Sequence, residues 1–189
     1  MRRFNFAVFG FVSVFLFWSS AVCQNALLAE LAKEDQDSRK GMTIARTDEE
    51  RIKIVLSLIG QGELKVPQDK YNAALVLQHT PFTFCDKKLV STSPDNYLLA
   101  HHLFKSAYEA GHKDSRYLTA AAIDRYLMMT KGYQKYGTQR LNNQETGKEE
   151  YPPIDRKTTD AERAVYGVPP LAELLKKYPE QASKKIPNL

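Results

Sequence analysis

The chain has 189 residues and a formal net charge of +5, from 27 Lys and Arg against 22 Asp and Glu. This length fits one domain with a single hydrophobic core, and a second domain is not needed. So small a positive surplus, without basic residues clustered on one face, excludes the charge pattern of a nucleic-acid-binding domain. We therefore expect no nucleic acid among the partners.

The first 23 residues have the pattern of a bacterial secretory signal peptide. Arg2 and Arg3 precede an apolar run from Phe6 to Trp18, and Ala21-Val22-Cys23 ends the segment with residues that a signal peptidase recognises. The run is shorter than the roughly 20 apolar residues that cross a membrane. We expect residues 1–23 to be cleaved, which gives a periplasmic or secreted protein with no stable membrane span. A retained anchor and lipidation of Cys23 are the alternatives.

Helical periodicity dominates residues 26–129. The expected helices are Ala26 to Lys40, Thr47 to Gly60, Gln68 to Thr80, Ser93 to Gly111 and Asp114 to Met129. Thr47 and Glu50 have the spacing of a capping box. The helix from Gln68 is apolar on nearly every side, which is typical of a central helix.

The fourth and fifth of these helices form an expected helical hairpin. Small side chains would let the two backbones approach closely, at Ala107, Ala110, Ala120, Ala121 and Ala122. The hairpin resembles one unit of a Sel1 or tetratricopeptide repeat. No second copy follows at a fixed period, so a solenoid is not expected.

The chain becomes polar and turn-rich after Gly132. A small β-hairpin is expected from Tyr136 to Leu141 and from Lys148 to Ile154. Short helices follow at Asp160 to Arg163 and at Leu171 to Tyr178. The sequence thus predicts a mainly α, compact domain of about five to seven helices with one β-hairpin. It occupies residues 24–180, before a flexible tail at residues 181–189.

Common catalytic signatures are missing from the sequence, which weakens the case for an enzyme without excluding one. Cys85 lies in an apolar segment, where a buried and inert cysteine is expected. His101 and His102 are helical neighbours about 100° apart, so they cannot chelate one metal ion together. We expect no metal and no cofactor.

Three polar groups of residues remain as candidates for a site: Gln78-His79, Asp124-Arg125, and the segment from Gln134 to Gln139. Each lies where an apolar residue would be the simpler choice. The candidate catalytic residues are His79 and Asp124, and the candidate ligand-binding residues are Gln78, Arg125, Gln134, Tyr136, Thr138 and Gln139.

Structural roles are an open interpretation for all three groups. His79 is placed to bond the last carbonyls of its helix. Asp124 can accept bonds from a neighbouring loop while Arg125 pairs with a carboxylate.

In their order along the chain, these motifs resemble a bacterial family catalogued as a domain of unknown function. The resemblance includes Gln78-His79, Asp124-Arg125-Tyr126, Gln134 through Tyr136-Gly137-Thr138-Gln139, Pro152-Pro153-Ile154, Asp160 to Arg163, Gly167, Pro170-Leu171, and the early pair Asp35 and Arg39. The segment Phe82 to Ser93 is longer here than in the family. The resemblance implies a helical domain and no established activity.

Two functions compete with a purely structural interpretation. The first is an exported module that binds a peptide, a protein or a cell-envelope component in a groove with exposed Tyr97, Tyr133 and Tyr136. The second is a hydrolase or transferase in which His79 is the base, Asp124 orients it, and Thr138 or Gln139 stabilises developing charge.

Overall fold

The computed structural model describes residues 23–85, 88–142, 149–182, 184 and 186. The predicted signal peptide, apart from Cys23, lies outside these residues. The helices are α1 (Ala26–Arg39), α2 (Asp48–Gly60), α3 (Pro67–Leu77), α4 (Asp95–Glu109), α5 (Ser115–Lys131), α6 (Asp160–Val165), α7 (Leu171–Lys177) and a 3-10 turn, η1 (Pro179–Ala182). The mainly helical domain predicted from the sequence is confirmed.

Side-chain capping is confirmed at one of the three helix starts where the sequence predicted it. The Thr47 hydroxyl accepts a bond from the Glu50 amide at 3.2 Å, and the Glu50 carboxylate accepts one from the Thr47 amide at 2.8 Å, so the predicted capping box is confirmed. Asp114 precedes α5 as expected, but its side chain makes no capping bond. The Ser93 side chain does not cap α4 either, because the helix begins two residues later, after Pro94.

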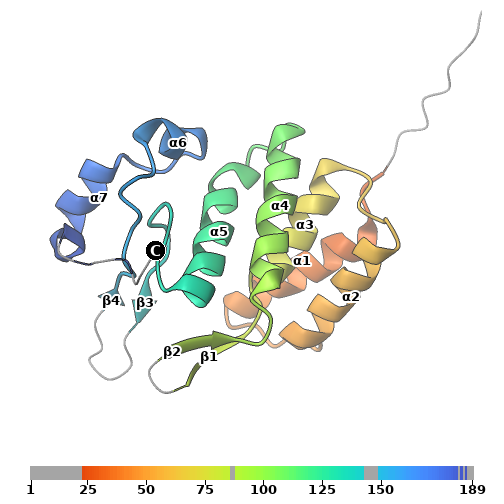
Figure 1. Ribbon diagram of the computed structural model, residues 1–189. Helices are drawn as coiled ribbons and strands as arrows, with labels where there is room; N and C mark the ends of the chain where they lie inside the picture. The colour runs from red at the N-terminus through yellow and green to blue at the C-terminus, as the bar shows by residue number, and fades with distance from the viewer. Residues whose placement is uncertain (1–22, 86–87, 143–148, 183, 185, 187–189) are drawn as a thin grey trace, which may run out of the picture.

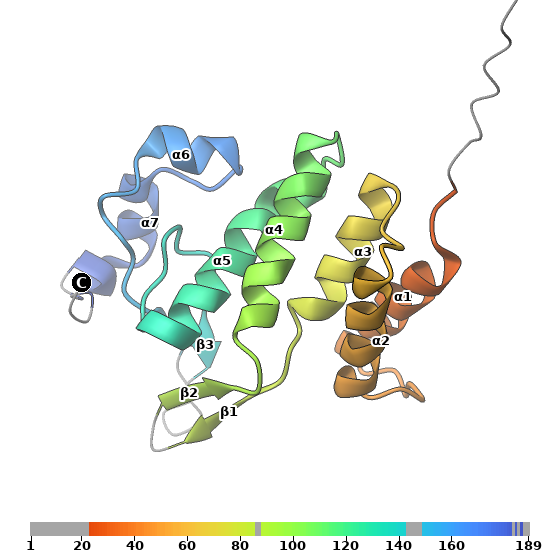
Figure 2. The same ribbon diagram turned by 45° about the vertical axis from the view of Figure 1, so that its right-hand side comes forward.

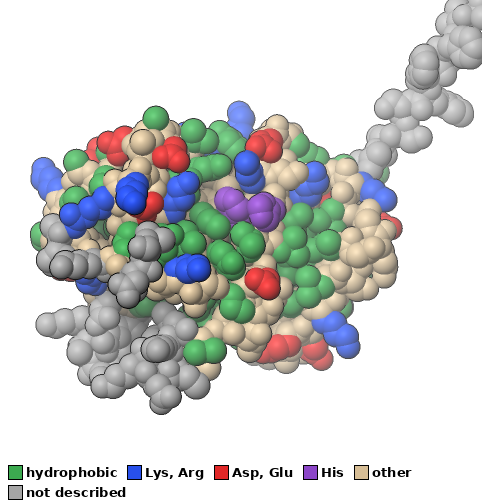
Figure 3. Space-filling view, viewed as in Figure 1, with side chains coloured by type: hydrophobic (Ala, Val, Ile, Leu, Met, Phe, Trp, Pro, Cys, Tyr) green, Lys and Arg blue, Asp and Glu red, His purple; other side chains and the backbone are tan. Residues whose placement is uncertain are grey.

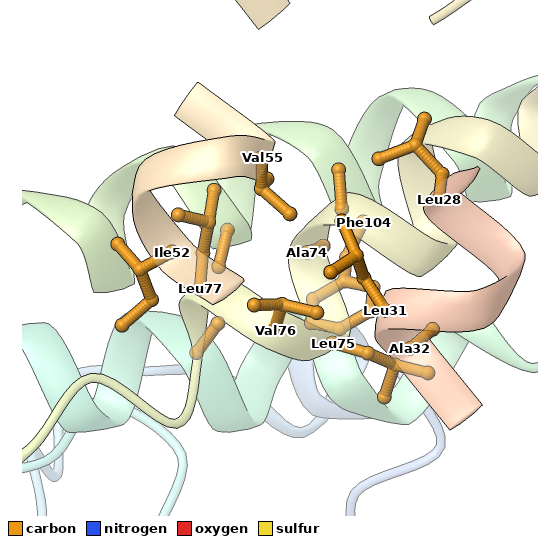
Figure 4. Close-up of a cluster of buried hydrophobic side chains, with 13 residues drawn as sticks. Leu28, Leu31, Ala32, Ile52, Val55, Ala74, Leu75, Val76, Leu77 and Phe104 are labelled. Carbon is orange, nitrogen blue, oxygen red and sulfur yellow. The ribbon is translucent and has the colours of Figure 1, made fainter. Parts of the chain in front are cut away.

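The helices pack side by side, from α1 and α2 at one end through α3, α4 and α5 to the C-terminal elements at the other (Figures 1 and 2). Helix α3 contacts α1, α2 and α4, and so lies at the centre, as its apolar surface predicted. Its buried side chains meet those of the neighbouring helices in the main core (Figure 4). Helices α4 and α5 form the expected hairpin, with Ala100, Ala107 and Ala122 fully buried.

Two small antiparallel sheets accompany the helices. Strand β1 (Phe82–Cys85) pairs with β2 (Lys88–Ser91), with Phe82 opposite Ser91, in a hairpin that the sequence did not predict. The predicted hairpin is shorter than expected, since β3 (Leu141–Asn142) pairs with β4 (Glu149–Glu150) over two residues. Residues 136–139 are not a strand, because side chains of Asp124 and Gln134 accept their amides.

The C-terminal elements cover the far side of α5. Ala120, Tyr136, Val168 and Leu174 form a second, smaller core cluster there. Gln181, which we expected at the start of a flexible tail, is instead buried and donates to the Tyr151 carbonyl at 2.7 Å. No helix within the described residues is long and apolar enough to cross a membrane.

Candidate functional site

Asp124 is a fully buried carboxylate that holds the loop after α5. Its Oδ1 accepts the amides of Lys135 at 2.7 Å and Tyr136 at 2.8 Å, and its Oδ2 accepts the amide and hydroxyl of Thr138 at 2.9 and 2.7 Å. Burial raises the pKa of Asp124, and these four bonds act against that rise. The predicted bonding of Asp124 to a neighbouring loop is therefore confirmed.

Gln134 and Arg163, both fully buried, hold the same loop from other sides. The Gln134 side chain accepts the Gln139 amide at 2.6 Å and donates to the Gln139 carbonyl at 3.0 Å. The Arg163 guanidinium donates to the Tyr136 carbonyl at 2.7 Å. We call Asp124, Gln134 and Arg163 the loop clamp. All three side chains bond backbone groups of the loop, which is the pattern of a structural network.

Gly137 allows the clamped loop to pack against the C-terminal elements. It has φ +81°, and a Cβ there would lie 2.7 Å from Ile154 Cδ1. Either fact alone disfavours a larger residue at this position. The tight approach joins α5 to the smaller core cluster.

Arg125 follows Asp124 in α5 but contacts different residues. Its Nε donates to Gln139 Oε1 at 2.9 Å, and its Nη1 donates to the Gln78 carbonyl. The predicted carboxylate partner of Arg125 is therefore wrong: both acceptors are neutral. None of the described residues accepts a hydrogen bond from its Nη2, and burial lowers the pKa of Arg125.

His79 contacts Asp35 rather than Asp124. Its Nδ1 lies 2.6 Å from Asp35 Oδ2, and Asp35, on α1, is only 1% exposed. The expectation that Asp124 orients His79 is wrong, because both oxygens of Asp124 bond the loop instead. An ionised carboxylate can only accept in this contact, so His79 Nδ1 is the donor and Asp35 fixes the orientation of the ring.

His79, Arg125 and Gln139 line one cleft of about 320 Å³. Gln78 contributes its backbone carbonyl there. The remaining charged lining residues are Arg39, Asp48 and Arg140, and we call this cavity the arginine cleft. The structure thus brings together four of the predicted site residues and assigns Asp124, Gln134, Tyr136 and Thr138 to the loop clamp and its loop.

The exposed aromatic residues predicted along the groove are buried in two of three cases. Tyr97 is 1% exposed, with its hydroxyl donating to the Thr80 carbonyl at 2.6 Å. Tyr136 is 4% exposed, with its ring 5.6 Å from that of Tyr166. Tyr133 is partly exposed. The arginine cleft is therefore defined more by charge than by aromatic surface.

Sequence reasoning missed Asp48 and Arg140 as site residues. It named Asp35 and Arg39 only as a motif pair and did not connect Asp35 with His79. A signal for Asp35 was present. It follows Leu28 and Leu31 at helical spacing, so a carboxylate lies on the buried stripe of α1 and needs a partner. Nothing local identified that partner, which lies 44 residues away.

The remaining histidine and cysteine candidates give no second site. The His101 Nδ1 lies 2.9 Å from the Thr119 carbonyl oxygen, and burial lowers the pKa of His101. Histidine side chains of α4 lie among hydrophobic side chains at the centre of one face (Figure 3). No group of three or more potential ligands suits a metal ion within the part of the chain described. The Cys85 side chain lies outside that part.

Comparisons with protein-family models, curated proteins and solved structures found no match. The resemblance stated from the motifs thus stays a prediction.

Proposed function

We propose that the protein is an exported binding module that recognises an anionic group in the arginine cleft. The group is a carboxylate or phosphate of a peptide, a protein or a cell-envelope component. One observation carries the proposal: Arg125 is partly buried, bonds only neutral acceptors and lines the cleft. The likeness of the α4–α5 hairpin to a Sel1 or tetratricopeptide unit also favours binding.

The energetics of Arg125 support an anionic ligand. Removing a cation from water is costly unless an opposite charge approaches it. The guanidinium fork matches the two oxygens of a carboxylate or phosphate, and Nη2 is available for such a contact. Arg39 is already paired with Asp48 at 2.5 Å, whereas both hydrogen-bond acceptors of Arg125 are neutral.

The test is an NMR titration of the arginine Nε–H signals with acetate and with inorganic phosphate. We expect the Arg125 Nε–H signal to shift saturably, with a dissociation constant in the millimolar range, about that of weak single-ion contacts. Arg125→Gln should abolish saturable shifts at the neighbouring Gln78 and Gln139. Arg46→Gln is the matched control, because Arg46 bonds two carboxylates, Glu30 and Glu34, and should leave the titration unchanged. Equal titration of Arg125→Gln and the parent protein would refute the proposal.

The second candidate function is a His-dependent hydrolase or transferase, and the contact between His79 and Asp35 favours it. In this function Asp35 orients the ring, and Nε2 takes a proton from a nucleophile in the cleft. Arg125 and Gln139, at the end of the Tyr136–Gln139 loop, would stabilise negative charge that develops on the substrate. None of the described lining residues is Ser or Cys, and the Thr80 hydroxyl already donates to the Leu77 carbonyl at 2.8 Å, so water is the nucleophile we propose.

Hydrolysis of p-nitrophenyl acetate and p-nitrophenyl phosphate tests this second function. General-base catalysis is worth about 10² to 10⁴ in rate, so His79→Gln should lower kcat by at least the smaller factor. Asp35→Asn should change the pH profile as well as kcat. His102→Gln is the control, because His102 is exposed on α4 outside the cleft. An unchanged rate in His79→Gln would exclude the base.

A further inference from the structure

A second cavity lies on the other side of the clamped loop. It has a volume of about 270 Å³ and is lined by Gly137 and Thr138 of the loop, Tyr117 of α5, and residues of α7. Tyr151 and Tyr178 complete its wall, so we call it the tyrosine cleft. Its volume is close to the lower end of the roughly 300 to 1,000 Å³ typical of small-molecule sites.

Two of the three tyrosines pack against each other. The ring centroids of Tyr151 and Tyr178 are 3.8 Å apart, with 31° between the planes, and Lys177 Nζ lies 5.2 Å from the Tyr178 ring centroid. The neighbouring Tyr151 side chain, together with Lys177, lowers the pKa of Tyr178. The hydroxyls of this pair are thus held as polar groups at one side of the cleft.

Tyr117 has a different environment. It is 46% exposed, and none of the described residues makes a ring contact with it or bonds its hydroxyl. An aromatic ring that is about half exposed beside a cavity can offer an apolar face to a ligand. One side of the cleft is therefore an open aromatic face, and the other is polar.

The charged residues of the cleft are Arg140, Lys177 and Glu173, so cations exceed anions there. Arg140 is 55% exposed in its side chain and only 3.5 Å from Glu149, which is a weak surface pair. Arg140 also lines the arginine cleft. The two cavities therefore meet at this side chain.

We propose that the tyrosine cleft binds a sugar ring that carries a carboxylate, as in a uronic acid. A pyranose has C–H groups on its faces, which stack on an aromatic ring, and hydroxyl groups around its edge. Tyr117 supplies the stacking face, Glu173 and the tyrosine hydroxyls bond the sugar hydroxyls, and Arg140 with Lys177 pairs with the carboxylate. A bare inorganic anion would leave Tyr117 unused.

A longer acidic glycan would extend past Arg140 into the arginine cleft. This extension rests on the proposed function, because it uses Arg125 for a second carboxylate. The subsite itself does not depend on Arg125. A monosaccharide and a trisaccharide therefore test the two ideas separately.

The experiment measures the affinity of galacturonic acid, trigalacturonic acid and galactose by NMR titration. We expect galacturonic acid to bind in the millimolar range and galactose at least about fivefold more weakly. Tyr117→Ala should weaken galacturonic acid about tenfold, which is the scale of one aromatic stacking contact. Lys177→Gln should weaken galacturonic acid but not galactose. Tyr108→Ala is the matched control, a partly exposed tyrosine on α4 outside both clefts.

Each failure has its own signature. The sugar subsite is overturned if galacturonic acid shows no saturable binding up to about 50 mM, or if Tyr117→Ala binds it as the parent does. The extension is overturned if trigalacturonic acid binds no more tightly than galacturonic acid. If trigalacturonic acid gains affinity that Arg125→Gln leaves intact, the subsite stands and the anion site at Arg125 fails.

Discussion

Asp124 and Arg125 are neighbours in α5 that carry opposite charges into two different environments. Asp124 accepts four hydrogen bonds from the loop, so both its oxygens are used inside the protein. Arg125 bonds two neutral oxygens and lines a cavity. The difference separates a charge that builds the fold from one that we propose is available to a ligand.

The same distinction applies to the groups around them. The loop clamp shapes the floor of the tyrosine cleft by fixing Gly137 and Thr138, and it places Gln139 beside Arg125. In the arginine cleft, the contact with Asp35 of α1 holds the His79 ring. The clamp is thus a support for both cavities, and loss of the clamp should cost stability before it costs binding.

The largest expected effect is that of Asp124→Ala. It leaves three backbone amides and a hydroxyl without their acceptor, and we expect the free energy of unfolding to fall by about 3 kcal/mol or more. Denaturant unfolding measures this loss. Asp114→Ala is the control, because the Asp114 side chain makes no capping bond, and its unfolding should be unchanged. An Asp124→Ala protein as stable as the parent would show that the clamp is not structural.

Gln134→Ala should have the next largest effect. Its side chain makes bonds to both backbone groups of Gln139 and to the Pro152 carbonyl, so we expect a loss of about 2 kcal/mol. Gln61→Ala, with its side chain bonded to Ser57 on the surface, is the matched comparison and should change stability little. Equal melting of the two variants would contradict the role of Gln134.

Arg125→Gln should cost little stability, in contrast to its neighbour. Its removal takes away a desolvated charge, and the two oxygens it leaves lie at a cleft that water can enter. We expect a change within about 1 kcal/mol, in either direction, as found for many residues kept for binding. A loss of unfolding free energy as large as that of Asp124→Ala would show that Arg125 stabilises the fold.

Much of the fold was predictable because its causes are local. Helical spacing, the Thr47 cap and the apolar surface of α3 act over a few residues. The bonding of Asp124 to a loop was predictable for a similar reason, since a charge within an apolar run needs nearby partners. The first strand of the predicted hairpin does not extend over residues 136–139, because side-chain acceptors took amides that a strand would have used.

The parts that were missed depend on distant contacts or on exposed residues. The contact between Asp35 and His79 joins α1 to the end of α3. Arg140 belongs to both clefts only because the clamped loop separates them, and its sequence context is that of an ordinary surface arginine. The spacing of residues within one helix predicts neither the Asp35–His79 contact nor the position of Arg140.

The smallest expected effect concerns the contact between α4 and α5, the hairpin that carries Asp124 and Arg125. His101, on α4, bonds the Thr119 carbonyl of α5, and burial lowers its pKa below the value in the unfolded chain. The unfolded chain therefore binds the proton first as the pH falls below about 6.5, so the free energy of unfolding should decrease there. Urea unfolding of the parent and of His101→Gln measures this decrease between pH 7 and pH 5, about the range in which histidine titrates. His102→Gln is the control. The His101→Gln variant should lose less stability over that range than the parent, whereas His102→Gln should follow the parent. If the free energy of unfolding depends on pH in the same way in all three proteins, protonation of His101 does not weaken the α4–α5 hairpin. The helices that carry Asp124 and Arg125 are then insensitive to pH at this contact.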